Sequence, residues 1–580
     1  MSKAIQQIPW GALEACPAAS CVKVAGNRDV WRIDLAAGTI YAKCYRSQGI
    51  VKQIVDSVRG AAAKREWLAL RQAAAVGVLA PAALAYATAG GHRSRGYSAV
   101  LITAAMPANA ESLEDAWLSA RRQGDPAAAR RCKGRLVEAL AELIARAHAG
   151  GLFHRDLHVG NILIFPHNGS VTAAMVDLHN ASLRTGISLS GVRSNLVQLN
   201  QWFARHASRT ERLRFLKQYC RRLAELLPAG GSAAAGTSRK FGHRALAQYV
   251  LKVSRRYAAR LYAKRDRRIL KRNKYFATLA LPDGWSARIA LDIKHGRPYD
   301  HPLSELPDKK GWWKILAGLP GLLAGGGVRV LKSTSDRRVV QADLEFAGVR
   351  WPVVAKCQRP GSPLERMLWR LGGDRLQREF LAGWQCLHRE LPVAVPLAVL
   401  TRQGASGAES ILLVEYITDS RDLDTFTKLQ LPEMPAGQAL ALKRRICWQL
   451  ARTLRGMWGC GLAHRDLKAA NIRLQIPRGN PESLKIVLVD VDGIRAPRWR
   501  PRQALLRSLA RLDASFAGMR AVTRTDRLRL LLAVLRGVDG GADRWKDAWR
   551  RIRRMSLRDQ AVIARQMPWL QPIAQAAGAE

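Results

Sequence analysis

No stretch of the 580-residue sequence reaches the roughly 18 apolar residues that a membrane-spanning helix needs. The first ten residues, from Met1 to Trp10, contain no apolar run of signal-peptide length. The nine cysteines form no C-x-x-C pair, and no histidine is spaced to join them in a zinc site. We therefore expect a soluble or peripheral protein with reduced, structural cysteines.

Acidic residues are few relative to basic ones. The chain has 45 Asp and Glu against 94 Lys and Arg, which gives a formal net charge of +49 at pH 7. Such an excess attracts polyanions, and charge alone leaves nucleic acid, nucleotides and anionic lipid surfaces open as partners. Nucleic acid is the least favoured of these, because no aromatic stacking platform or zinc-finger pattern accompanies the charge.

What the sequence does contain is one motif that occurs twice. H-R-D-L-x-x-x-N appears as HRDLHVGN over residues 154–161 and as HRDLKAAN over residues 464–471. It is the catalytic-loop signature of protein-kinase-like phosphotransferases. In-line phosphoryl transfer needs a carboxylate that orients the acceptor hydroxyl and an amide oxygen that holds a metal. The candidates are Asp156 and Asp466 for the first role, and Asn161 and Asn471 for the second.

Both motifs lie in the same sequence context. A helix-like run that ends in a glycine turn precedes each, over residues 136–151 and 446–461. A β-like run that ends in aspartate follows each, and Asp177 and Asp490 are the expected additional metal ligands. Two matches in matching contexts argue against a chance tripeptide.

A strand lysine followed by a helical glutamate also occurs twice. Lys43 precedes Glu66 by 23 residues, and Lys356 precedes Glu379 by the same number. In kinase-like enzymes such a lysine binds the α- and β-phosphates of the nucleotide, and the glutamate clamps the lysine. The two lysines are 313 residues apart, which indicates near-collinear repeats, each with a strand-rich small lobe and a helical large lobe.

Together these residues resemble the lipopolysaccharide core sugar kinases, the Kdo and heptose kinase family, over about residues 20–225 and 325–535. HRDLHVGN is closer to that family than to protein kinases, whereas HRDLKAAN resembles Ser/Thr kinases equally well. The resemblance implies transfer of the ATP γ-phosphoryl group, with Mg²⁺, to a sugar hydroxyl of the lipopolysaccharide inner core. The implied residues are Asp156 and Asp466 for catalysis, Lys43, Glu66, Lys356 and Glu379 for the nucleotide, and Asn161, Asp177, Asn471 and Asp490 for the metal.

Three features depart from a peptide kinase or from the family. Neither half has a G-x-G-x-x-G loop, and only the polar loops at residues 26–29 and 332–337 could cradle phosphate. Neither half has the long segment ending in A-P-E that builds a peptide platform. The second half keeps an acidic residue and a glycine as Asp492-Gly493, where the first half has His179-Asn180. We therefore expect the second half to be the more active.

Two segments lie between the repeats. Residues 252–274 include 11 Lys and Arg, and on a helix six of them would form one stripe: Arg256, Arg260, Lys264, Arg267, Lys271 and Lys274. The stripe fits a solvated face, an anionic phospholipid surface or the phosphates of a substrate. Residues 311–324 are apolar with a Trp pair at one end, which favours a helix that covers the second small lobe over a membrane-interface element.

The predicted fold is α+β, with two tandem protein-kinase-like bilobal domains at residues 1–280 and 325–580 and a linker at 281–324. Expected partners are ATP, an anionic glycolipid acceptor and an anionic membrane surface. The expected location is cytoplasmic, with peripheral attachment to the cytoplasmic face of the inner membrane as a further expectation. Two alternatives stay open: a bacterial Ser/Thr protein kinase, and a non-catalytic scaffold that binds nucleotide or membrane.

Overall fold

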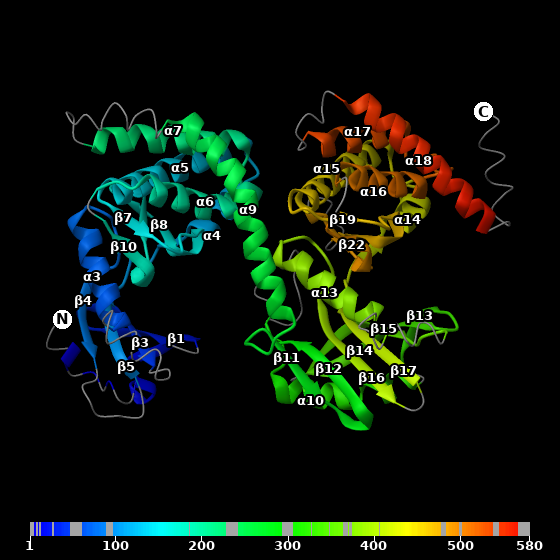
Figure 1. Cartoon of the computed structure of the whole chain (residues 1–580), viewed down its shortest axis with the longest axis horizontal. Helices are drawn as coiled ribbons and strands as arrows, with labels where there is room; N and C mark the ends of the chain where they lie inside the picture. Colours follow the sequence, from blue (N-terminus) through cyan, green and yellow to red (C-terminus); the bar gives the residue numbers. More distant parts are fainter. Residues whose placement is uncertain are drawn as a thin grey trace. The chain divides into compact units, whose positions relative to one another are not determined.

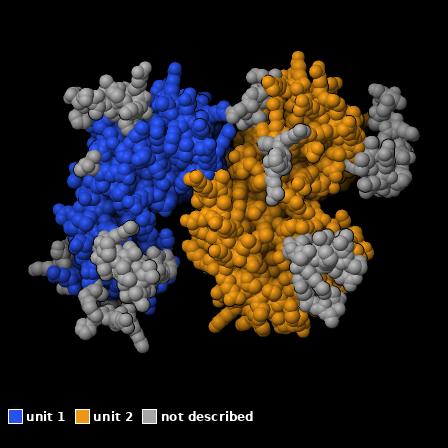
Figure 2. Space-filling view, in the orientation of Figure 1, with its two compact units in different colours: residues 1–258 blue, residues 259–580 orange. Residues whose placement is uncertain are grey.

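The computed structural model divides the chain into two compact units, Met1–Ala258 and Ala259–Glu580, here called the first and second domains (Figures 1 and 2). The residues that it describes are 5–6, 8, 10, 13–25, 28–46, 61–88, 97–184, 186–227, 242–292, 306–325, 327–346, 348–362, 369, 374–404, 407–476, 483–497, 501–536 and 544–566.

The small lobe of the first domain is a five-stranded antiparallel sheet. Its order is β1-β2-β3-β5-β4, with β1 at Ala19–Ala25, β2 at Arg28–Leu35, β3 at Gly38–Arg46, β4 at Ala83–Thr88 and β5 at Tyr97–Ala104. Alternation along β3 buries Ile40, Ala42 and Cys44 on one face, so Lys43 projects from the other. Helix α3 at Ala62–Ala75 packs against this sheet and buries Glu66.

The large lobe of the first domain is mainly helical. Its helices are α4 at Leu113–Arg122, α5 at Pro126–Ala149, α6 at Leu189–His206 and α7 at Arg209–Leu226, and its short strands are β6 to β10 between Glu111 and Leu183. After α5 the chain turns at Gly151, whose φ is +70° and where a Cβ would lie 2.1 Å from the Arg184 carbonyl oxygen. Only glycine fits there, and this turn leads directly into β7 at Leu152–His154 and the first HRD motif.

The small lobe of the second domain repeats this sheet and extends it. Its seven strands run in the order β11-β12-β16-β17-β15-β14-β13. They are β11 at Phe276–Ala280, β12 at Trp285–Ala290, β13 at Arg329–Ser333, β14 at Arg337–Phe346, β15 at Val349–Gln358, β16 at Pro396–Gly404 and β17 at Gly407–Glu415. Strands β13 to β17 correspond to the five strands of the first domain, with α13 at Arg375–His388 in the place of α3. The hairpin of β11 and β12 therefore adds two strands at the β16 edge.

The linker predicted at residues 281–324 does not match the domain boundary in the structure. Strand β12 is part of the second sheet, and the division between the units falls within α9 at His243–Ile269. Helices α10 at Lys309–Ala317 and α11 at Leu319–Ala324 belong to the second small lobe. Trp312 is fully buried there, and its Nε1 donates to the Ala290 carbonyl at 2.8 Å. The interpretation of residues 311–324 as a covering helix is confirmed, while residues 293–305 of the predicted linker lie outside the described residues.

The large lobe of the second domain repeats the helices of the first. They are α14 at Leu423–Thr425, α15 at Ala436–Gly459, α16 at Pro501–Ser515, α17 at Arg524–Leu535 and α18 at Trp545–Gln566. Between them lie β18 at Ser420–Asp422, β19 at Ala463–His464, β20 at Ile472–Gln475, β21 at Lys485–Leu488 and β22 at Ile494–Arg495. Helices α7 and α17 each begin with a capping box, Ser208 with Glu211 and Thr523 with Asp526. The same acids pair with Lys133 at 3.1 Å and Lys443 at 2.9 Å, so the repeat extends through this helix.

The basic stripe is shorter than predicted. Arg256, Arg260, Lys264 and Arg267 are exposed along α9, but the helix ends at Ile269, so Lys271 and Lys274 lie beyond it. The continuing basic run had instead predicted a helix that extends to Lys274. In the described part of the chain, no helix combines the length and apolarity needed to cross a membrane.

Candidate active sites

The two HRD motifs form loops with the same hydrogen bonds. In the first domain, Asn161 Nδ2 donates to the Asp156 carbonyl at 3.0 Å, and the Asp156 amide donates to His154 Nδ1 at 3.1 Å. In the second, Asn471 Nδ2 donates to the Asp466 carbonyl at 3.0 Å, and the Asp466 amide donates to His464 Nδ1 at 3.3 Å. Each predicted catalytic aspartate is therefore joined to its predicted metal-binding asparagine.

Burial of the histidine supports this geometry. His154 and His464 are 1% and 0% exposed, and burial lowers the pKa of both. A histidine with a lowered pKa is neutral near pH 7, so its Nδ1 has a lone pair that can accept the amide proton. The histidine of the motif thus holds the backbone of the aspartate in place.

The lysine and glutamate pairs predicted from their spacing both form. Lys43 Nζ lies 2.5 Å from Glu66 Oε1 and 3.2 Å from Asp177 Oδ1. Lys356 Nζ lies 2.5 Å from Glu379 Oε1 and 3.2 Å from Asp490 Oδ1. In each domain the lysine therefore connects its own strand to the helix that carries the glutamate and to the large lobe that carries the aspartate. Burial alone would lower the pKa of Lys356, but Glu379 and Asp490 outweigh it and raise that pKa, so the lysine is charged.

The aspartates at the strand ends adopt an uncommon backbone conformation. Asp177 and Asp490 have φ of +62° and +56°, in the left-handed region. Their preceding residues close the turn, since the amides of Val176 and Val489 donate to the carbonyls of Asn161 and Asn471 at 2.9 and 3.0 Å. Aspartate tolerates this region better than most residues. The turn aims each carboxylate at the lysine.

In the second domain, the site carries more negative than positive charge. Arg375 Nε pairs with Asp492 Oδ2 at 2.6 Å, while its Nη2 is 3.9 Å from Asp490 Oδ1. Lys356 and Arg375 thus face three carboxylates, those of Glu379, Asp490 and Asp492. Burial would raise the pKa of Asp490, but Lys356 and Arg375 hold that pKa below its usual value, so Asp490 is ionised.

Oxygen ligands for a divalent cation are available in this domain. Among the described residues, no hydrogen bond reaches Asp490 Oδ2 or the side-chain oxygen of Asn471. Mg²⁺ binds carboxylate and amide oxygens and retains several waters. The residues present therefore fit Mg²⁺.

The first domain has a different arrangement at the same place. Both oxygens of Asp177 accept from Arg28, with Nη1 at 2.9 Å and Nη2 at 2.8 Å. His179 Nδ1 lies 2.9 Å from Asp177 Oδ1. Burial would raise the pKa of Asp177, but His179, Arg28 and Lys43 outweigh it and hold that pKa far below its usual range.

A metal fits poorly in this first-domain site. Glu66, Asp177 and His179 each bring one potential ligand atom within 4.8 Å of the others. However, Arg28 and Lys43 already occupy the carboxylate oxygens that a cation would need. The predicted metal role of Asn161 and Asp177 stays a prediction that this geometry does not favour.

The two predicted catalytic aspartates also differ in their partners. Asp466 pairs with Lys468 Nζ at 2.9 Å and with Arg511 Nε at 3.3 Å, and Arg511 comes from α16. In the described part of the first domain, no ion pair or side-chain hydrogen bond reaches the Asp156 carboxylate. Arg511 also pairs with Asp559 at 3.5 Å, so the formal charges of these four side chains balance.

Sequence reasoning missed four residues of these clusters: Arg28, Arg375, Arg511 and Tyr45, whose Oη donates to Glu66 Oε2 at 2.6 Å. One signal was available, since Arg375 precedes Glu379 by four residues and so shares its helix face. Arg28 was noted only as part of a polar loop, and its neighbours Gly26 and Asn27 lie outside the described residues. Arg511 is 45 residues from Asp466, and no spacing rule connects them.

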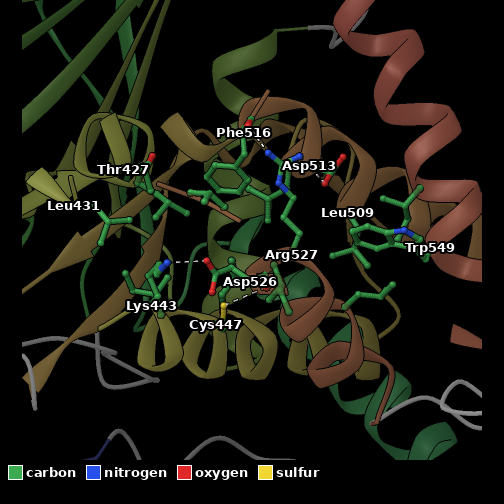
Figure 3. A pocket seen from close by; sticks show the side chains of 18 residues that line it. Thr427, Leu431, Lys443, Cys447, Leu509, Asp513, Phe516, Asp526, Arg527 and Trp549 are labelled. Carbon is green, nitrogen blue, oxygen red and sulfur yellow. Dashed lines mark hydrogen bonds and ion pairs between the residues drawn. The ribbon is translucent and has the colours of Figure 1, made fainter. Parts of the chain in front are cut away.

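One hollow of the second domain does not include any of the predicted site residues. It encloses about 740 Å³, open solvent at its mouth included, and α15 to α18 supply most of its apolar wall (Figure 3). At its polar edge Lys443 pairs with Asp526, and Arg527 pairs with Asp513 at 3.5 Å. A smaller hollow of the first domain lies among the corresponding helices, with Glu211 and Arg212 in its wall. None of the residues that line these two hollows belongs to the side-chain clusters around Lys43 and Lys356.

Parts of this chain are similar to known proteins. A lipopolysaccharide core heptose(I) kinase WaaP from Pseudomonas aeruginosa is 28% identical over 249 residues, which cover 40% of this chain and 88% of that protein. Among solved structures, a WaaP in complex with acyl carrier protein is 23% identical and covers 43% of this chain and 93% of its own, with a TM-score of 0.32. The Mycobacterium tuberculosis PknI kinase domain is 15% identical and covers 39% and 96%, with a TM-score of 0.25.

The family model described as lipopolysaccharide kinase (Kdo/WaaP) family matches residues 22–219 and 364–533. One matched segment lies in each domain, and together they span more than half of the sequence. The chain therefore belongs to the lipopolysaccharide kinase (Kdo/WaaP) family, as a tandem of two kinase-like domains.

Proposed function

We propose that this kinase transfers the γ-phosphoryl group of ATP to a sugar hydroxyl, Kdo or heptose, of the lipopolysaccharide inner core, and that the second domain performs the transfer. The observation that carries the choice of domain is the pair of Asn471 and Asp490, each of which has a side-chain oxygen available for a cation. The Asp177 carboxylate of the first domain is instead bound on both oxygens by Arg28.

The proposed step uses Asp466 as the residue that orients the acceptor. The hydroxyl oxygen attacks the γ-phosphorus, the bond from that phosphorus to the β,γ-bridging oxygen breaks, and ADP leaves. The hydroxyl proton passes to the Asp466 carboxylate. Lys468 and Arg511 hold that carboxylate at 2.9 and 3.3 Å, which fixes its position against the attacking oxygen.

The nucleotide would be held from the small lobe. Lys356 is placed by Glu379 at 2.5 Å and would bind the α- and β-phosphates, as would Lys43 with Glu66 in the first domain. Asn471 and Asp490 would hold Mg²⁺, which would supply positive charge to stabilise the negative charge of the phosphates. Arg375 pairs with Asp492 at 2.6 Å, and Asp490 Oδ2 accepts no hydrogen bond from the described residues.

The acceptor is proposed to be a compact sugar and not a peptide. Asp490 is followed by α16, which begins at Pro501, so there is no room for the long segment on which an extended peptide docks. A sugar that carries phosphate or carboxylate would also be attracted by a chain of net charge +49, an effect that weakens as salt rises.

The test is transfer of labelled phosphate from ATP to lipid A–core, with a basic protein and buffer as the other acceptors. We expect labelling of the glycolipid, slower at high salt, and negligible labelling of the protein. Asp466→Ala should abolish it, and Asp156→Ala, the matched change in the first domain, should reduce it much less. Labelling of basic protein at Ser or Thr that depends on Asp466, without glycolipid labelling, would instead favour a protein kinase. Equal losses from the two changes would contradict the assignment to the second domain.

The same kinase is proposed to act at the cytoplasmic face of the inner membrane. Arg256, Arg260, Lys264 and Arg267 are exposed on one stripe of α9, and each cation near an anionic surface contributes about 1 kcal/mol at moderate salt. Changing Arg260, Lys264 and Arg267 to Glu should release the protein from vesicles that contain anionic phospholipid. Unchanged sedimentation with such vesicles would mean that the stripe is only a solvated face.

A further inference from the structure

Arg28 of the first domain occupies the position that a cation would take beside Asp177. Its guanidinium binds both carboxylate oxygens, Oδ1 at 2.9 Å and Oδ2 at 2.8 Å, and the Arg28 side chain is only 14% exposed. Such a fork-to-fork pair is among the stronger and more directional ion pairs in proteins. It leaves neither oxygen of Asp177 without a positively charged partner.

The second domain has an arginine at the same register, which makes the contrast specific. Arg28 on β2 lies opposite Tyr45, two residues after Lys43, and Arg337 on β14 lies opposite Gln358, two residues after Lys356. Arg337 is 45% exposed and pairs with its neighbour Asp336 at 3.3 Å. It therefore leaves Asp490 untouched.

The charges around the two aspartates differ accordingly. In the first domain Arg28 and Lys43 balance Asp177 and Glu66, so the formal charge of the cluster is zero with His179 neutral. In the second domain Lys356 and Arg375 face Glu379, Asp490 and Asp492, which leaves one negative charge. Only the second cluster has an unbalanced carboxylate to attract a divalent cation.

The guanidinium also retains donors for a phosphate. It has five N–H groups in a planar fork, and the pair with Asp177 uses two of them. The remaining three, together with the Lys43 ammonium, are donors of the kind that bind phosphate oxygens.

We propose that Arg28 takes the place of the divalent cation in the first domain, so that this domain binds a nucleotide triphosphate without metal while the second domain alone holds one. The proposal rests on the proposed nucleotide role of the clefts, and it adds that the two copies divide the work: one metal-dependent site for transfer and one metal-free site for binding.

Manganese binding to the full chain tests the metal part. With a non-hydrolysable ATP analogue present, electron paramagnetic resonance of Mn²⁺ should show that every bound ion depends on Asp490, so Asp490→Asn lowers Mn²⁺ affinity at least tenfold. Adding Arg28→Gln to Asp490→Asn should create a new Mn²⁺ site, and adding Arg337→Gln, the matched control, should not. An ion that Asp490→Asn retains and a further Asp177→Asn removes would overturn the proposal, as would no gain from Arg28→Gln.

Nucleotide binding in EDTA tests the second part. A fluorescent ATP analogue should bind the wild-type chain without metal, and this binding should be lost in Lys43→Met but retained in Lys356→Met. Loss in Lys356→Met alone, or no EDTA-resistant binding, would overturn it. Neither measurement uses turnover, so a failure to phosphorylate lipid A–core would refute the proposed function and leave this result standing. Circular dichroism of each variant verifies that it is folded.

Discussion

Replacing Lys356 by Met should destabilise the second domain through the charge that it leaves behind. Lys356 Nζ lies 2.5 Å from Glu379 Oε1, and the Glu379 side chain is only 4% exposed. Removing one partner of a buried ion pair leaves an uncompensated charge, which costs about 3–5 kcal/mol. We expect Lys356→Met to lower the free energy of unfolding by about this amount and to abolish phosphate transfer.

The double change Lys356→Met with Glu379→Leu separates stability from chemistry. It removes the unpaired carboxylate and fills the space with an apolar side chain, a replacement that is often neutral for stability. The double variant should therefore unfold in urea close to the wild type and remain inactive, because the nucleotide lysine is still missing. Urea unfolding followed by fluorescence, with glycolipid labelling on the same samples, provides both readouts.

The first domain offers the matched pair. Tyr45 Oη donates to Glu66 Oε2 at 2.6 Å, so Lys43→Met leaves one hydrogen bond on that carboxylate. At the register-equivalent position of the second domain stands Gln358, whose Oε1 has no hydrogen-bond partner among the described residues. Hydrogen bonds to charged groups contribute about 1.5–3 kcal/mol, so Lys43→Met should cost less than Lys356→Met by roughly that amount. Equal costs in the two domains, or no recovery in the double variant, would refute this reasoning.

Three further outcomes are expected. His148 is fully buried, and burial lowers its pKa from 6.5 to about 4. Between these pH values the folded state binds fewer protons than the unfolded chain. The contribution of neutral His148 to the free energy of unfolding is therefore fully present above about pH 6.5 and is lost as the pH falls toward 4, by about 3 kcal/mol. His148→Phe should flatten this loss in urea titrations between pH 6.5 and 4, and an unchanged slope would contradict it. Arg511→Ala should lower kcat by between about tenfold and a hundredfold with little change in the KM for ATP, because Arg511 positions Asp466 at 3.3 Å; an effect on KM alone would contradict the positioning role. Gly151→Ala should destabilise the first domain in urea, because its Cβ would lie 2.1 Å from the Arg184 carbonyl oxygen, and wild-type stability would show that the turn can shift.

The repeated framework around the two lysines could be predicted from the order and spacing of residues alone. The spacing of Lys43 to Glu66 and of Lys356 to Glu379 predicted ion pairs that the structure forms at 2.5 Å. This was possible because alternation along a strand and the period of a helix fix which side chains share a face. The HRD motif was equally readable, since its hydrogen bonds join residues only two to five positions apart.

Which strands join the same sheet was harder to predict from the sequence. Residues 281–284 form the turn of the β11 and β12 hairpin, with Asp283 and Gly284 at φ of +55° and +74°. An Asp-Gly pair between apolar runs is a hairpin signal, but the prolines nearby favoured a linker interpretation. Pairing of β12 with β16, more than a hundred residues later, is a long-range contact that no local pattern reveals.

The differences between the two copies depend on long-range contacts that are visible only in the folded chain. Arg28 and Arg337 begin equivalent strands, yet one binds Asp177 across 149 residues and the other binds its neighbour Asp336. Arg511 reaches Asp466 from a helix 45 residues away, and Arg375 reaches Asp492 across more than a hundred. The spacing of residues predicts which side chains share a face of a strand or helix. The partner of a long, flexible arginine depends instead on which carboxylates the packed lobes bring within its reach.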